Sequence, residues 1–193
     1  EAYQKLQLGQ MVAKVKREVE HFAELDTFDS ALRLRLATAY LLMKRYQESA
    51  LITEDMLEDM PPDPVVESAS VNLVQSWNAI ERWSKAAEAG RLFAEVFPQS
   101  PKLPFVLYLQ GIAEQRMMDY DAAVATFQTL ANQQPQSEHA PRGMFMQGFT
   151  LLLAEHHPEA IAAFDAFLED HPKHELADAA TYWRAMGFSF DKQ

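Results

Sequence analysis

Apolar, small and aromatic positions along this chain recur with a period of 37 residues. The clearest copy is the stretch 104–135, in which Gly111, Ala123, Phe127 and Pro135 are separated by 12, 4 and 8 residues. The spacing predicts two antiparallel helices. Gly111 and Ala123 let the helices approach closely, Phe127 fills the gap between them, and Pro135 ends the second helix.

Three further columns fit the same frame. One column holds the prolines that end the second helices: Pro61, Pro98, Pro135 and Pro172. A second column holds the residue that begins each second helix: Tyr46, Trp83, Tyr120 and His157. The third holds a small residue within each second helix: Ser49, Ala86, Ala123 and Ala160. Chance does not produce several matching columns in one frame. The sequence therefore predicts an all-α solenoid of antiparallel helix pairs, with about four repeats, an N-terminal helix and a C-terminal half repeat.

The frame also gives the domain organisation. We predict a capping helix over 1–25 and a repeat array over 26–193, with repeats at about 29–62, 63–99, 100–136 and 137–173 and a half repeat at 174–193. The N-terminal helix has an apolar stripe at steps of 3 and 4: Leu8, Met11, Val12, Val15, Val19 and Phe22. This stripe either caps the first core face or mediates self-association. In the half repeat, Trp183 and Phe188 should be partly exposed because no second helix follows them.

The order of small, small, phenylalanine and proline positions resembles the tetratricopeptide repeat from about residue 29 to the C-terminus, although the common period is about 34. The extra residues fall in the linkers PQSPKLP, PQSEHAP and PKHELAD. These linkers, followed by the alanine-rich ELADAATYW, resemble bacterial cell-envelope members of the family, including the periplasmic Tol-Pal-associated coordinator and the outer-membrane barrel-assembly lipoprotein. The resemblance implies a right-handed solenoid that acts as a periplasmic or cell-envelope scaffold, with a cytoplasmic location as the alternative.

In arrays of this family the first helix of each pair lines a concave groove. The positions that correspond here become aromatic toward the C-terminus, and they define a predicted groove for a protein or peptide partner: Phe105, Tyr108, Ile112, Phe145, Phe149, Tyr182 and Met186. A contiguous apolar patch of this kind marks a recognition surface. The alternative is that these side chains pack against neighbouring helices as core. The family's lysine, asparagine and arginine clamp for a terminal carboxylate is missing from these rows, so we predict an apolar helical or extended ligand.

Composition narrows the functional classes. The net charge is −11, and an acidic surface repels phosphate backbones, which argues against nucleic acid as a partner. No apolar run approaches the roughly 18 residues of a membrane span. The chain has no cysteine, which excludes disulfides and thiolate metal sites.

Catalytic and cofactor signals are missing from the sequence. There is no phosphate-cradling glycine loop and no G-x-S-x-G elbow, so we expect neither an enzyme nor a cofactor. Five histidines gather in the last third: His139, His156, His157, His171 and His174. Their places in the frame are too far apart for one metal ion, so we interpret them as solvated turn residues. The acidic run Glu54, Asp55, Glu58, Asp59, Asp63 and Glu67 is interpreted as a solvated face.

Two other functions stay open at this point. The chain could be an oligomerisation or structural module of a larger secretion or envelope protein that uses its exposed repeat ends. It could also be a regulatory segment attached to an enzyme elsewhere in a longer protein, since we expect this sequence to be a fragment.

Overall fold

The computed structural model describes residues 10, 13–14, 30–58 and 64–191. Within these residues every regular element is an α-helix, so the all-α prediction is confirmed. The chain divides into two compact units, Glu1–Phe97 and Pro98–Gln193, which we describe separately. The predicted capping helix over 1–25 lies outside the described residues, except for helical turns at Gln10 and at 13–14.

The first unit contains four described helices: α2 (Ser30–Leu42), α3 (Tyr46–Glu58), α4 (Pro64–Ala79) and α5 (Trp83–Val96). Each helix packs against the next in the chain, and α2 also contacts α4. The side chains of Leu36, Tyr40, Trp77 and Phe93 are buried in this unit. Asn72 on α4 donates a hydrogen bond of 2.8 Å to the hydroxyl of Thr38 on α2, which joins the two first helices.

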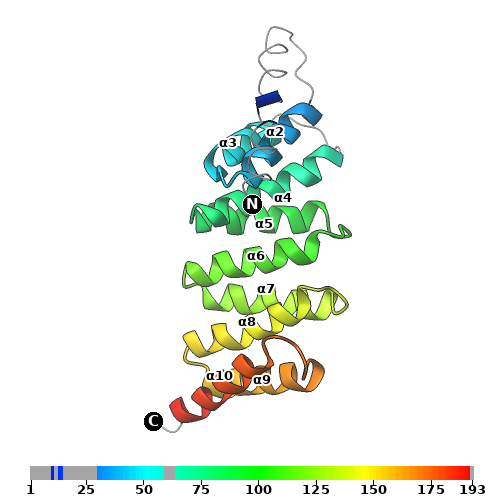
Figure 1. Cartoon of the computed structure of the whole chain (residues 1–193). Helices are drawn as coiled ribbons and strands as arrows, with labels where there is room; N and C mark the ends of the chain where they lie inside the picture. The colour runs from blue at the N-terminus through cyan, green and yellow to red at the C-terminus, as the bar shows by residue number, and fades with distance from the viewer. Residues whose placement is uncertain (1–9, 11–12, 15–29, 59–63, 192–193) are drawn as a thin grey trace. The chain divides into compact units, whose positions relative to one another are not determined.

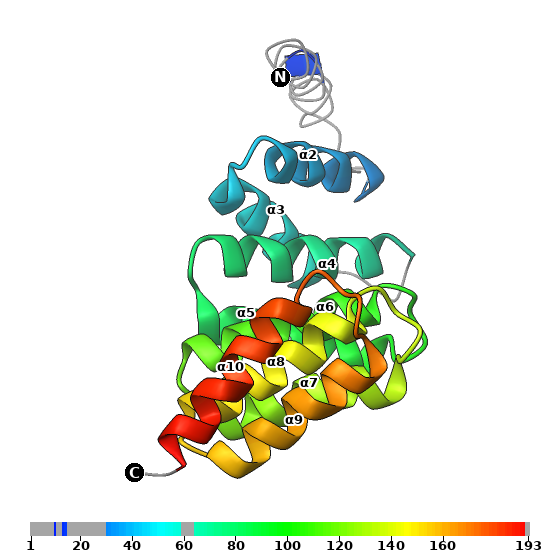
Figure 2. The ribbon, with the colours of Figure 1, turned by 60° about the horizontal axis from the view of Figure 1, so that its bottom comes forward.

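The second unit contains five helices among its described residues: α6 (Leu103–Arg116), α7 (Tyr120–Gln133), α8 (Ala140–Leu153), α9 (His157–Asp170) and α10 (Ala177–Phe190). Figures 1 and 2 show these helices following one another in chain order, and consecutive helices are in contact. In addition, α6 contacts α8 and α8 contacts α10, so the three first helices of this unit are neighbours.

The helix boundaries follow the 37-residue frame. The second helices α3, α5, α7 and α9 begin at Tyr46, Trp83, Tyr120 and His157, which are 37 residues apart. Prolines stand directly after the C-cap residues of α5, α7 and α9, where a residue without a backbone N–H stops a helix from continuing. The same residue pattern therefore gives α5, α7 and α9 the same length of 14 residues.

The turn inside each pair is also repeated. Lys44, Glu81, Met118 and Glu155 are 37 residues apart, and all four adopt the left-handed conformation with φ of 60 to 62°. The next residue donates its backbone N–H to the carbonyl five residues earlier, as in the bond of 3.0 Å from Asp119 to Glu114. This is the Schellman ending of a helix, which usually has glycine at the left-handed position. Here four residues with side chains adopt it.

The linkers between pairs carry a recurring polar contact. The hydroxyls of Ser100 and Ser137 accept hydrogen bonds of 3.0 and 3.1 Å from the backbone N–H two residues later. At the corresponding place before α10, Nδ1 of His174 accepts a bond of 3.2 Å from the N–H of Leu176. A histidine thus replaces serine as the acceptor that satisfies a free N–H near the start of a helix.

The predicted wedge between paired helices is present in the second unit. A Cβ atom built on Gly111 would stand 2.6 Å from Cε1 of Phe127, so only glycine leaves room for the ring. The next pair repeats this arrangement with Gly148 and Phe164, at 3.0 Å. Both phenylalanine rings are completely buried. The glycine thus allows the two helices to approach closely, and the buried phenylalanine ring fills the space that its missing side chain leaves.

Candidate functional site

The predicted groove residues lie on the three first helices of the second unit. We call this set the aromatic face: Phe105, Tyr108 and Ile112 on α6, Phe145 and Phe149 on α8, and Tyr182 and Met186 on α10. Tyr182 is 58% exposed, and the other six are half-buried. Within each helix they are spaced by three or four residues, so they lie on one side of that helix.

His139, the residue before α8, joins the aromatic face at its α6 end. Its ring lies 5.2 Å from Phe105 and is stacked 6.1 Å from Tyr108, with 20° between the ring planes of the stacked pair. Burial lowers the pKa of His139, and the nearby charge of Glu138 opposes this effect in part. The interpretation of His139 as a solvated turn residue is therefore wrong, because the linker before α8 packs its imidazole against these two rings.

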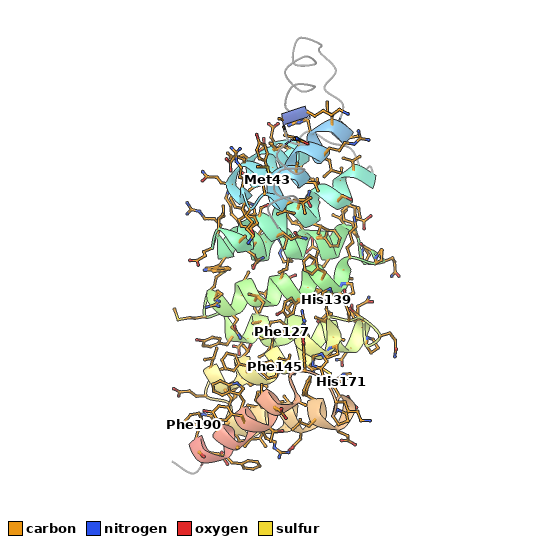
Figure 3. The ribbon with its side chains drawn as sticks, viewed as in Figure 1. Met43, Phe127, His139, Phe145, His171 and Phe190 are labelled. Atoms are coloured by element: carbon orange, nitrogen blue, oxygen red, sulfur yellow. The ribbon has the colours of Figure 1, made fainter. Side chains whose placement is uncertain are left out.

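Two members of the aromatic face also support the second helices. Tyr108 contacts the buried ring of Phe127 at 6.4 Å, and Phe145 makes edge-on contacts with Phe164 and Phe167 at 5.7 and 6.1 Å. Figure 3 labels Phe127, His139 and Phe145 among these side chains. The rings of Tyr108 and Phe145 are thus held in position by contacts with buried rings of the second helices, while part of each ring remains accessible to solvent.

Trp183 connects α8 and α10. Its ring lies 5.0 Å from Phe149 and 5.2 Å from Tyr182, in edge-on geometry both times. Trp183 is half-buried and Phe188 is 48% exposed. The groove prediction omitted Trp183, although the adjacent Tyr182 and the aromatic character of this row were signals that could have included it.

Polar contacts hold the neighbouring first helices of the second unit against one another. The side-chain amide of Gln115 on α6 donates a bond of 2.7 Å to the buried hydroxyl of Thr150 on α8. At the surface, Arg142 on α8 pairs with Glu175 in the linker before α10 at 2.8 Å, which raises the pKa of the guanidinium and lowers that of the carboxyl group. Arg142 is therefore already paired with a carboxylate of this chain.

The other described histidines of the last third are not gathered as the ligands of a metal ion would be. Among the described residues, no group of three or more histidine and carboxylate side chains converges as metal ligands would. His171 and His174 are half-buried, and each ring lies 5.7 Å from Phe167. The interpretation of these two as solvated turn residues is also wrong, since the linker brings both rings onto Phe167 near the end of α9. Figure 3 labels His171 there.

The acidic run is partly paired. Glu54 accepts a bond of 2.7 Å from Lys85 on α5, and Asp55 forms an ion pair with Arg33 on α2. Glu58 is exposed at the end of α3, while Asp59 and Asp63 lie outside the described residues. Lys85 also lies 4.4 Å from the centre of the Trp77 ring, so a single cation contacts both an acidic and an aromatic partner.

The recurring helix pairs, their glycine and phenylalanine wedge and their common turn define the tetratricopeptide-type fold. Solved structures of this type resemble the chain. "MamA AMB-1" matches with a TM-score of 0.67 and 17% identity, covering 93% of this chain and 98% of that one. YrrB, titled a TPR protein with an unusual peptide-binding site, matches with a TM-score of 0.72 and 17% identity, covering 93% and 86%.

A putative kinesin light chain of Podosopora anserina, with nearly identical TPR-like repeats, matches with a TM-score of 0.71 and 13% identity, covering 89% of this chain and 91% of that one. Residues 113–193 match a protein-family model described as YfiO, outer membrane lipoprotein. A comparison with curated proteins found no match. No helix among the described residues has the length and hydropathy of a membrane span.

Proposed function

We propose that this chain is a protein-interaction module that binds an apolar helical or extended segment of another protein on the aromatic face. The observation that carries the proposal is the partial exposure of aromatic and apolar side chains on three neighbouring first helices. Contiguous apolar surface of this kind is rare on soluble proteins unless a partner covers it. The proposal assigns neither catalysis nor a cofactor to the chain.

The chemistry of the aromatic face favours side-chain recognition over carboxylate recognition. Its members are aromatic or aliphatic, and the nearby Arg142 is already paired with Glu175. Tyr108, Phe145 and Phe149 are held by ring contacts, so a ligand would not have to order them on binding. Burial of one large apolar side chain contributes about 1.5–3 kcal/mol, so a few contacts would give a stable complex.

A place in a bacterial envelope assembly is part of this proposal. It is supported by the match of residues 113–193 to the outer membrane lipoprotein family model and by the envelope-type linkers. The net charge of −11 supports a protein partner over nucleic acid. Fractionation of the source cells, followed by an antibody against this chain, should place the protein in the envelope fraction. Recovery only from the cytoplasm would contradict this location.

The binding site can be tested with peptides selected from a random displayed library on the immobilised chain. We expect apolar peptides whose affinity, measured by fluorescence anisotropy, falls about tenfold or more in Tyr182→Ser and in the double variant Tyr108→Ser with Phe149→Ser. Tyr182 is largely exposed, so this variant should keep its circular dichroism spectrum and thermal midpoint even if the double variant loses stability.

Phe188→Ser is the matched control, because Phe188 is exposed on the same helix but does not belong to the aromatic face. Its affinity should equal that of the unmodified chain. If Tyr182→Ser and a folded double variant both bind the selected peptides with unchanged affinity, the aromatic face is not the binding site.

Self-association through the last helix is a second candidate function. Phe188 and Phe190 on α10 are 48% and 39% exposed, and within the described residues no helix follows α10. Size-exclusion chromatography with light scattering separates the two functions. A dimer that Phe188→Ser converts into a monomer would favour self-association, whereas a monomer that binds the selected peptides would favour the aromatic face.

A further inference from the structure

An apolar cavity of about 370 Å³ opens in the first unit, and it has no part in the aromatic face. Its walls come from Leu57 on α3 and from Leu92 and Val96 on α5, and Leu73 of α4 lies between them. Among the described residues, α4 packs against both α3 and α5, and the ion pair between Lys85 and Glu54 links α5 to α3 directly. The cavity therefore lies between two second helices and above the first helix that they share, and its size is within the range of ligand pockets, about 300–1,000 Å³.

The apolar wall of the cavity on α5 departs from the repeat frame. Leu92 and Val96 are 46% and 59% exposed. The corresponding residues on the other second helices are polar or small: Asp55 and Asp59 on and after α3, Thr129 and Gln133 on α7, and Ala166 and Asp170 on α9. Since the fold needs no apolar side chain at these two positions, their apolar character on α5 requires another explanation, and contact with a partner supplies one.

The rim of the cavity is electronegative. Glu54 and Glu58 of α3 line it, and Lys85 already pairs with Glu54, so Glu58 is the exposed carboxylate at the rim. The C-terminal ends of α3 and α5 lie here as well, and neither helix has a basic residue in its last turn. Helix C-termini carry partial negative charge, so both ends add to the field of Glu58.

We propose that this cavity is a second docking site, which binds an amphipathic helix of a partner protein through one or two large apolar side chains flanked by lysine or arginine. The apolar side chains enter between Leu92, Val96 and Leu57, and the cation pairs with Glu58. Two second helices separated by a shared first helix form a groove in which a helix can lie with apolar anchors at i and i+4. This site requires no ligand on the aromatic face.

The test uses a dye-labelled helical peptide made only of leucine, lysine and alanine, with leucines at i and i+4 spacing, and a second peptide with glutamate in place of lysine. Fluorescence anisotropy with the full chain should show binding of the lysine peptide and at least tenfold weaker binding of the glutamate peptide. The double variant Leu92→Thr with Val96→Gln, which takes both residues from α7, should weaken the lysine peptide at least tenfold. Glu58→Lys should weaken it by a similar factor.

Two controls distinguish this site from general charge attraction and from the aromatic face. Thr129→Ala changes the position on α7 that corresponds to Leu92 and should leave the affinity unchanged. Tyr182→Ser should also leave it unchanged, so that the two proposed sites fail independently. Circular dichroism and thermal unfolding show that each variant keeps its fold, which is expected because the replaced side chains are exposed or, at Thr129, half-buried.

Four results would overturn the proposal. They are the lack of binding by the lysine peptide, equal affinity for the glutamate peptide, unchanged affinity in a folded Leu92→Thr with Val96→Gln variant, and a loss in Tyr182→Ser as large as in that variant. Light scattering adds a fifth outcome. If the unmodified chain is a dimer that the double variant converts into a monomer, a second copy of the chain occupies the cavity and the partner assigned here is wrong.

Discussion

Replacement of Gly111 by alanine tests the physical basis of the fold, because a single methyl group enters the most tightly packed of the glycine positions in the second unit. The new Cβ would stand 2.6, 2.7 and 2.9 Å from three ring atoms of Phe127. Ordinary contacts of a Cβ begin at about 3.4 Å. The ring is completely buried and also contacts Tyr108, so it cannot move away without displacing other side chains.

Two opposing effects decide the size of the change. Alanine is favoured over glycine in a helix interior by about 1 kcal/mol. Overpacking of a core by a methyl group costs about 1–3 kcal/mol, and contacts as short as these belong at the upper end. We expect Gly111→Ala to lower the free energy of unfolding by about 1–2 kcal/mol and the thermal midpoint by about 2–8 °C.

The assay is urea unfolding followed by circular dichroism, with Gly148→Ala as the matched variant. At Gly148 the nearest atoms of Phe164 would be 3.0 Å away, so the steric cost is smaller and the helix preference of alanine offsets more of it. The loss should be clearly smaller than for Gly111→Ala. In the Gly111→Ala background, Phe127→Leu removes the clashing ring atoms and should be less harmful than in the unmodified chain. A Gly111→Ala variant as stable as the unmodified chain, or equal effects of Phe127→Leu in both backgrounds, would refute the wedge.

Three further predictions concern the turns, the linkers and a half-buried acid. Met118→Gly should raise the free energy of unfolding by about 0.5–1 kcal/mol in the same assay, because glycine adopts the left-handed conformation without steric cost. Glycine at the preceding C-cap residue Met117, which has a right-handed backbone conformation, should lower it. His174→Ala should lower it by about 1 kcal/mol through loss of the acceptor for the N–H of Leu176, and His174→Ser should restore most of this loss, as Ser137 occupies the same place one repeat earlier. Burial raises the pKa of Glu114 above 4.5, so the folded chain binds a proton more readily than the unfolded chain, and this contribution to stability falls as pH rises through the window above 4.5. Glu114→Gln should therefore flatten the pH dependence of the thermal midpoint in that window and raise the midpoint at neutral pH, and an unchanged pH profile would contradict this reasoning.

The periodic part of the fold could be predicted because packing repeats itself. Gly111 and Phe127 have the sizes that a close helix pair requires, and the same sizes recur at Gly148 and Phe164. Proline after a second helix is an equally direct signal, since it has no backbone N–H. Helix boundaries followed from these residues without any knowledge of the other elements.

The turns carried no comparable signal. The left-handed positions hold Lys44, Glu81, Met118 and Glu155, none of which favours that conformation. Their common geometry follows from the closure of each helix pair, which compensates for the local strain. Because tertiary packing imposes the left-handed conformation on these four residues, their side-chain types do not predict it.

For the candidate site, the 37-residue frame predicted which helix carries each residue, but it could not predict the contacts between side chains of different repeats. Phe149 and Tyr182 could be assigned to first helices from their spacing, but the position of Trp183 between their rings depends on how α8 and α10 pack. His139 was assigned to solvent together with the other histidines of the last third, because their places in the frame are too far apart for one metal ion. The fold of that linker, fixed by the hydroxyl of Ser137, turns its ring onto Tyr108.

Two residues depart from the repeat pattern in opposite ways: one is polar where the other repeats have core residues, and one is apolar where the others have polar or small residues. Glu114 occupies the column of Tyr40, Trp77 and Leu151, all of which are buried, and this polar residue among core positions costs stability at neutral pH. Leu92 is the reverse case, since it is an exposed apolar residue in a column of polar or small ones. Neither departure helps a helix pair to pack, because the other pairs pack without it. In a repeat array, a residue that departs from its column and either lowers stability or exposes an apolar side chain is therefore a candidate for a role outside the fold. Leu92 and Val96 are such residues, and the acidic surface around them also indicates the chemistry of the partner.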